Sequence, residues 1–276
     1  MRIFFAPFAI RAYVAVVAVG LTTPIVGAFL VQRRLALVGD GIGHLAFAGV
    51  AIGVVVGVAP VWGALAVAVL GALTLERLRT AGRVTGDLAL ALVFYGGLAI
   101  GAVVLSAKHR FDASAIGVLF GSVLTTSWRD VIVVVVLCVA VTAIIVPFYR
   151  QLLSVALDEE TARAAGLPVD GLNMLIVTLT ALLVAAGMRV VGLLLIASLL
   201  VIPVAAGTRL AHSFRDTMLW GTAIGAASSL AGLMFALGQG SVSPGGTIVL
   251  ASLGAFVAAA IAGRRAARRH PRQATR

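Results

Sequence analysis

The sequence predicts an all-α fold: a polytopic membrane helical bundle of eight to nine transmembrane helices, with two additional short helices. Hydrophobic residues make up 61% of the 276 residues and charged residues 11%, whereas soluble domains carry about 25% charged residues. The mean hydropathy is +1.13. Apolar runs of about 20 residues, the length that crosses a bilayer, recur from end to end. We therefore expect a single transmembrane domain over residues 1–263.

Nine segments are long and apolar enough to be expected to cross the membrane. The first is predicted to be retained rather than cleaved as a signal peptide, because its apolar run is long and ends at Arg33-Arg34. A piece at 116–124 is too brief to span, so we expect a re-entrant or interfacial helix there. Because that piece and a predicted tight turn at Met188-Arg189 could each be counted differently, the number of transmembrane helices is fixed only to within about one. The nine lie at about 12–32, 35–58, 61–78, 87–107, 131–149, 172–187, 190–210, 217–237 and 248–263.

Individual prolines, glycines and an aspartate predict kinks, a helix cap and an interior position for particular segments. Pro24 predicts a kink in the first segment, since proline removes a backbone hydrogen bond. Asp87 follows Gly86 at the start of the fourth, where a carboxylate caps a helix; the alternative is a role at the inner mouth of a pathway. Pro203 leaves a backbone carbonyl without its helical hydrogen bond in the seventh segment. This favours a kink that serves packing, and the alternative is a role in a transport pathway. The second segment is expected in the bundle interior because it carries glycine at 39, 41, 43, 49, 53 and 57.

The stretch between the fifth and sixth segments, about 154–170, predicts a short cytoplasmic helix. Asp158 is placed to cap it, Glu159 and Glu160 favour its positive end, and Gly166 followed by Pro168 stops it. A docking function and a plain solvated connector are both compatible with this pattern.

The net charge of +11 indicates membrane orientation rather than nucleic-acid binding, because the positive residues are spread between segments. If Arg33 and Arg34 face the cytoplasm, fifteen of the 21 lysines and arginines lie on that side, as the positive-inside rule expects. Nine crossings then place the amino terminus outside and the carboxyl terminus inside, with the basic tail 264–276 near anionic lipid. The fifteen are Arg33, Arg34, Arg77, Arg79, Arg83, Arg150, Arg163, Arg209, Arg215 and the six arginines from Arg264 onward.

The strongest indication of chemistry is Asp40 followed four residues later by His44. Residues at this spacing share one helix face, and a charged acid at membrane depth costs about 2.5 to 3.5 kcal/mol, so such groups line a pathway or a site. Imidazole suits zinc and iron, and carboxylate suits manganese. Two ligands do not close a tetrahedral site, which favours passing a metal over storing it. An interhelical hydrogen-bonded pair is the structural alternative.

Motifs for ATP binding and for common hydrolases are missing from the sequence. Lys108 is the only lysine and does not lie in a G-x-x-x-x-G-K-[ST] motif. No G-x-S-x-G, H-E-x-x-H or paired C-x-x-C occurs. We therefore predict that the chain is not itself an enzyme and that, if ATP drives it, another subunit binds the nucleotide.

The order of motifs resembles the membrane permease of metal-ion ABC importers, which serve zinc, manganese and iron uptake. The segment from Arg33-Arg34 through Gly39-Asp40 and His44 to Gly49-Val50-Ala51-Ile52-Gly53 is similar to that family's pattern. The likeness covers about Leu21 to Val257. It includes Phe111-Asp112 with Leu119-Phe120-Gly121, Asp158 to Gly166, Val190 to Leu195, Ile202-Pro203-Val204-Ala205-Ala206 and Ser243-Pro244-Gly245.

The resemblance implies a permease that translocates a divalent transition metal, zinc or manganese and possibly iron, with no permanently bound cofactor. It implies three partners: a second copy of the chain, a cytoplasmic ATPase dimer and an extracytoplasmic metal-binding protein. Asp40 and His44 would contact the metal. The helix at Asp158 would be the coupling helix that docks on the ATPase, through Asp158, Glu159, Glu160, Ala162, Ala165 and Gly166.

Two departures from the family leave the metal open. Many zinc-type members carry an additional histidine in the fourth segment, where this chain reads Ala91-Leu92-Val93-Phe94-Tyr95, and the neighbours of Asp40 are Gly41 and Gly43. Three other functions are alternatives: an ion- or proton-coupled secondary transporter with Asp40 as carrier, a membrane-embedded enzyme with an acid-base pair, and a permease for a vitamin or siderophore.

Overall fold

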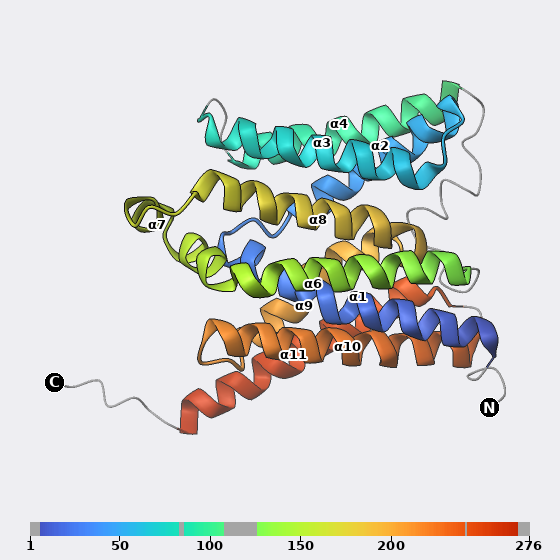
Figure 1. The fold of residues 1–276 in the computed structure, drawn as a ribbon. Helices are drawn as coiled ribbons and strands as arrows, with labels where there is room; N and C mark the ends of the chain where they lie inside the picture. Colours follow the sequence, from blue (N-terminus) through green and yellow to red (C-terminus); the bar gives the residue numbers. More distant parts are fainter. Residues whose placement is uncertain (1–5, 83–85, 108–125, 241, 270–276) are drawn as a thin grey trace.

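A computed structural model describes residues 6–82, 86–107, 126–240 and 242–269, and within them the chain forms ten helices and no strand (Figure 1). Eight are long and apolar enough to cross a membrane; the shorter apolar helix α9 raises the possible crossings to nine. The predicted piece at 116–124 lies outside the described residues. The helices are α1 (Pro7–Gln32), α2 (Val38–Val56), α3 (Pro60–Thr80), α4 (Gly86–Ala107), α6 (Trp128–Leu157), α7 (Glu159–Ala164), α8 (Val169–Val191), α9 (Leu193–Gly207), α10 (Phe214–Gln239) and α11 (Pro244–Arg269).

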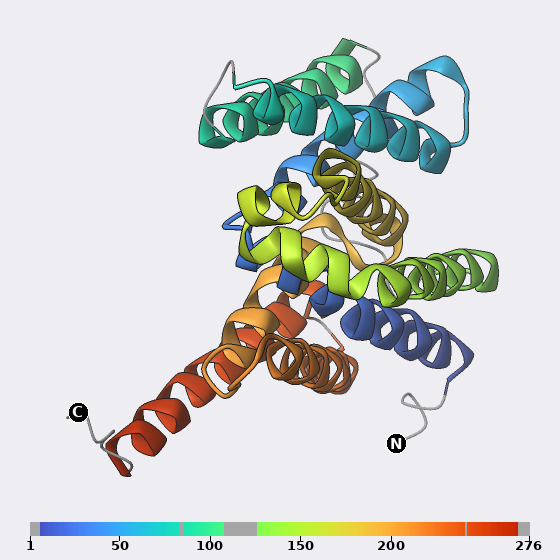
Figure 2. The ribbon, with the colours of Figure 1, turned by 60° about the vertical axis from the view of Figure 1, so that its left-hand side comes forward.

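The helices form three groups across the bundle. Helices α2, α3 and α4 pack together on one side, and α9, α10 and α11 lie on the other, with α8, α6 and α1 between them (Figures 1 and 2). The short α7 lies at one end of the bundle. Helix α1 begins at the opposite end, and α11 ends at the α7 end (Figure 1). The predicted bundle of eight to nine helices is therefore confirmed.

The centre of the bundle is built on α1, α2 and α8, the most buried of the membrane-length helices. The interior position predicted for α2 is confirmed, because its glycines at 39, 41, 43, 49 and 53 are all buried. A Cβ atom at Gly49 would lie 2.3 Å from the backbone oxygen of Gly63 on α3. Glycine therefore sets the close approach of these two helices.

Several helix ends differ from the sequence expectation. The turn predicted at Met188-Arg189 is wrong: α8 continues through both residues to Val191, and the break comes at Gly192 with φ of 90°. Methionine and arginine are good helix formers, whereas glycine adopts positive φ at little cost. Helix α6 extends eight residues beyond Tyr149 to Leu157, where Asp158 begins the next helix.

Candidate functional site

Asp40 and His44 lie in the first two turns of α2, on one helix face as their spacing predicts. The His44 Nε2 atom is 3.9 Å from Asp40 Oδ1, which is too long for a hydrogen bond. The Asp40 side chain is 35% exposed and the His44 side chain 13%. The pair is therefore unbonded, with its carboxylate accessible and its imidazole largely enclosed.

Packing, rather than a hydrogen bond, orients the His44 ring. The Phe94 ring of α4 meets it edge to face with centroids 4.2 Å apart. The buried Nδ1 atom of His44 has no hydrogen-bond partner among the described residues. Metal-binding histidines usually have the second nitrogen fixed by a carboxylate or carbonyl. Here Phe94 takes over the orienting role.

A groove between the start of α2 and α4 opens beside this pair. Its volume is about 320 Å³, and its lining includes both Asp40 and Asp87. Asp87 lies in the first turn of α4 and is exposed, so the structure brings together two carboxylates that are 47 residues apart in sequence. The full lining is Leu37, Asp40, Asp87, Leu90, Ala91, Phe94 and Tyr95.

The donor set fits brief contact with a divalent ion. Metal bonds to imidazole nitrogen and to carboxylate oxygen are each about 2.0 to 2.2 Å long, so the 3.9 Å between Nε2 and Oδ1 lies within reach of one shared ion. No group of three or more His, Cys, Asp or Glu side chains suited to hold a metal occurs in the described part of the chain. The pair therefore offers an incomplete coordination shell.

Pro203, the other residue considered for a pathway, lies elsewhere. It is buried inside α9 and does not line the α2–α4 groove. The structure thus gives Pro203 a packing position in the opposite helix group.

At the α7 end of the bundle, the predicted short helix is present with its predicted cap and stop. Asp158 Oδ1 accepts hydrogen bonds from the backbone N–H groups of Glu160 and Thr161 at 2.9 and 3.1 Å. The Thr161 hydroxyl donates to the other carboxylate oxygen at 2.6 Å, and these bonds hold the pKa of Asp158 below its ordinary value. Gly166 follows the helix with φ of 81°.

Glu159 turns inward and joins α7 to three other helices. It pairs with Arg33 after α1, lies 3.5 Å from Arg79 of α3, and accepts a hydrogen bond from Asn173 of α8 at 3.3 Å. Arg79 also binds the buried Glu76 at 2.7 Å. Burial raises the pKa of Glu159, but Arg33 and Arg79 outweigh it and hold that pKa below the ordinary value. The carboxylate is therefore charged at neutral pH.

Comparison with known proteins assigns the chain to a family. A family model described as the ABC 3 transport family matches residues 6–263. The chain belongs to the ABC 3 transport family. It is 35% identical over 244 residues to a probable metal transport system membrane protein of Treponema pallidum, covering 88% of this chain and 91% of that protein.

Further relatives in the family carry names that include a metal. The manganese transport system membrane protein MntC of Halalkalibacterium halodurans is 30% identical over 90% of this chain and 85% of its own. The high-affinity zinc uptake system membrane protein ZnuB of Haemophilus influenzae is 27% identical over 87% of this chain and 92% of its own.

A solved structure confirms the fold of this family member. PsaBC from Streptococcus pneumoniae in complex with Fab matches with a TM-score of 0.79 and 27% sequence identity, covering 92% of this chain and 91% of that one. This chain therefore shares its helical membrane fold with that structure.

Sequence reasoning missed two features of this ABC 3 family member. It did not place Phe94 against His44, because an aromatic in an apolar segment carries no local sign of its neighbour. It also did not anticipate the charged cluster of Glu76, Arg79, Arg33 and Glu159. The sequence did carry one signal for that cluster: Glu76 is an acidic residue near the end of the third apolar run.

Proposed function

We propose that this chain is the membrane permease subunit of an ATP-driven importer for a divalent transition metal, with zinc and manganese as the candidate ions. Asp40 and His44 contact the ion in transit. The observation that carries the proposal is this unbonded carboxylate and imidazole pair beside a groove in the membrane-spanning part of the chain. Ionisable groups at such depth mark ion pathways.

The incomplete coordination shell agrees with transport rather than storage. Conduction requires a site that binds well enough to admit an ion and weakly enough to release it. Asp87 offers a second carboxylate along the same groove, which we assign to the mouth of the pathway. The metals named for relatives, manganese and zinc, accept the oxygen and nitrogen donors present here.

The proposed assembly contains two copies of the permease, two ATPase subunits and an extracytoplasmic metal-binding protein. The absence of a Walker A motif from the sequence requires a separate ATPase. We assign α7 as the coupling helix. In this role Glu159 and the buried Ala162 face the permease, Asp158 caps the helix, and the docking face consists of exposed residues such as Glu160, Ala165 and Gly166.

Metal uptake by cells that carry single variants tests the ligand assignment. D40A and H44A should each lower uptake by about tenfold or more, while the variant permease still reaches the membrane and binds its ATPase. D216N and H212A are matched controls, because they change the same residue types in and before α10, away from the groove. Normal uptake in both D40A and H44A would remove the pair from the pathway.

Reconstitution separates this function from the secondary-transport alternative. The purified chain in liposomes should move metal only with its ATPase partner and ATP, whereas a proton- or ion-coupled carrier would transport alone. Transport by the isolated chain along an ion gradient would overturn the ATP-driven assignment.

A further inference from the structure

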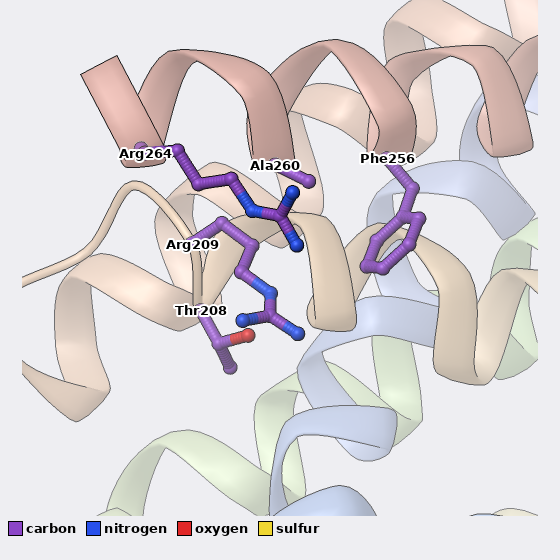
Figure 3. A pocket seen from close by; sticks show the side chains of 6 residues that line it. Thr208, Arg209, Phe256, Ala260 and Arg264 are labelled. Carbon is purple, nitrogen blue, oxygen red and sulfur yellow. The ribbon is translucent and has the colours of Figure 1, made fainter. Parts of the chain in front are cut away.

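A second groove lies between the end of α9 and the end of α11, remote from Asp40. Its volume is about 440 Å³. Figure 3 shows the side chains of Arg209, Arg264 and Phe256 among the residues that line this space. The lining is Thr208, Arg209, Phe256, Ala260, Gly263 and Arg264.

The two arginines place two like charges in one groove, and the described residues supply no counter-charge to either. Neither forms an ion pair or side-chain hydrogen bond with another residue of the described ranges; the Arg209 guanidinium lies 6.0 Å from the centroid of the Phe256 ring. Neighbouring positive charges repel. A phosphate between them would convert that repulsion into charge-assisted, bidentate hydrogen bonds.

The proximity of the two arginines is fixed by the backbone. A Cβ atom at Gly263 would lie 2.6 Å from the backbone oxygen of Arg209. Only a residue without a side chain permits α11 to approach the end of α9 this closely. The groove is therefore built by helix packing and does not depend on the chance overlap of two long side chains.

The groove is basic at the membrane boundary and apolar further in. Arg264 ends the membrane-length span Pro244–Arg264, and Thr208 and Arg209 directly follow α9. Phe256 lies eight residues before Arg264, which is about 12 Å deeper at about 1.5 Å per residue. The backbones of Arg209 and Arg264 thus lie near the membrane boundary. The Arg209 guanidinium reaches along the groove to within 6.0 Å of the Phe256 ring centroid, so a phosphate held by the arginines would lie where lipid headgroups meet acyl chains.

We propose that this groove binds a phosphate-bearing anion, and that its occupant is the headgroup of an anionic phospholipid. The lipid phosphate lies between Arg209 and Arg264, and the first carbons of one acyl chain lie along Phe256 and Ala260. A bound lipid holds the ends of α9 and α11 together. The site is distinct from the metal groove and does not rest on the metal assignment.

Native mass spectrometry of the full-length chain in detergent tests the site, with phosphatidylglycerol and phosphatidylcholine of the same acyl chains as probes. The chain should bind phosphatidylglycerol in preference to phosphatidylcholine. Each arginine near the surface contributes about fivefold to the affinity for an anionic lipid, so R209Q/R264Q should weaken phosphatidylglycerol binding about thirtyfold. G263A should also weaken it, although it keeps both charges.

The control variant R77Q/R150Q removes two exposed arginines outside the groove. Equal phosphatidylglycerol binding by R77Q/R150Q and R209Q/R264Q would overturn the proposal. A second arm titrates inorganic phosphate: saturation by phosphate, with no preference for phosphatidylglycerol, would overturn the lipid as occupant. Loss of ATPase copurification in R209Q/R264Q with unchanged lipid binding would assign the groove to a protein contact instead.

Discussion

Phe94 of α4 packs against the His44 ring, with ring centroids 4.2 Å apart. An apolar ring there orients the imidazole but offers the metal no donor. The residue at position 94 therefore sets how many ligands an ion meets in this part of the groove. Because borderline-soft zinc gains more from imidazole than manganese does, position 94 also bears on the choice of metal.

The change F94H should convert the incomplete shell into one with a third ligand. A histidine at 94 starts from the same helix position and faces His44, so zinc should bind the purified permease about ten- to a hundredfold more tightly. Zinc transport should become slower, because a more complete shell releases the ion less readily. Zinc titration by isothermal calorimetry and uptake by the reconstituted transporter measure the two effects.

The apolar variant F94L is the control for lost aromatic packing. It should leave zinc affinity within a few fold of the parent and affect uptake through looser orientation of His44. If F94H binds zinc no better than F94L does, residue 94 does not face the ion.

Helix α1 packs against α9 through a glycine that tolerates no side chain. A Cβ atom at Gly27 would lie 1.9 Å from the backbone oxygen of Leu200. G27A should therefore push the two helices apart and destabilise the bundle by about 1 to 3 kcal/mol. Thermal unfolding in detergent, followed by fluorescence, should show a lower midpoint for G27A.

The matched control for G27A is G254A on α11, where an added Cβ meets nothing within 4 Å. Alanine favours a helix over glycine by about 1 kcal/mol, so G254A should leave the unfolding midpoint unchanged or higher. Equal loss in both variants would show that helix propensity, not the α1–α9 contact, controls stability.

Glu159, although its side chain is 39% exposed, links α7 to Arg33 after α1, to Arg79 of α3 and to Asn173 of α8. E159Q should leave Arg33, whose side chain is 6% exposed, without its carboxylate. The helix would then lose a fixed position, and association with the ATPase should weaken about tenfold, which corresponds to about 1.4 kcal/mol. Binding of the purified ATPase to the permease in detergent measures this change.

D170N is the control for E159Q, because it removes the exposed Arg163–Asp170 pair on the same segment. Exposed ion pairs contribute little, so D170N should bind the ATPase as the parent does. E160R should weaken binding by a different route, since it reverses a charge on the proposed docking face. Parental affinity in E159Q would mean that α7 keeps its place without the cluster.

Local chemistry made the elements of this molecule predictable, whereas contacts between distant residues were not. The cap at Asp158 and the stop at Gly166 follow from side-chain and backbone preferences within nine residues. Arg33 and Glu159 are 126 residues apart, and no periodicity in either segment brings them together. The same holds for His44 and Phe94. The Asp40 and His44 pair was visible because both residues lie on one helix, but its groove required α4.

At the scale of the whole molecule, a cluster of arginines lies at the α7 end of the bundle. Arg33, Arg79 and Arg163 lie around α7, and helix α11 ends at this same end of the bundle (Figure 1). The positive-inside rule predicts that such an end faces the cytoplasm. The α2–α3 turn lies at the opposite end and is therefore expected outside the cell.

Single-cysteine labelling in intact cells checks this orientation. Cys138 is buried, so C138A supplies a background without thiols. In it, A164C on α7 should react with a membrane-impermeant maleimide only after the cells are broken, whereas V58C at the α2–α3 turn should react in intact cells; both positions are exposed. Labelling of A164C in intact cells with protection of V58C would invert the topology. It would then place α7 on the face where no ATPase is available, which rules out its role as the coupling helix.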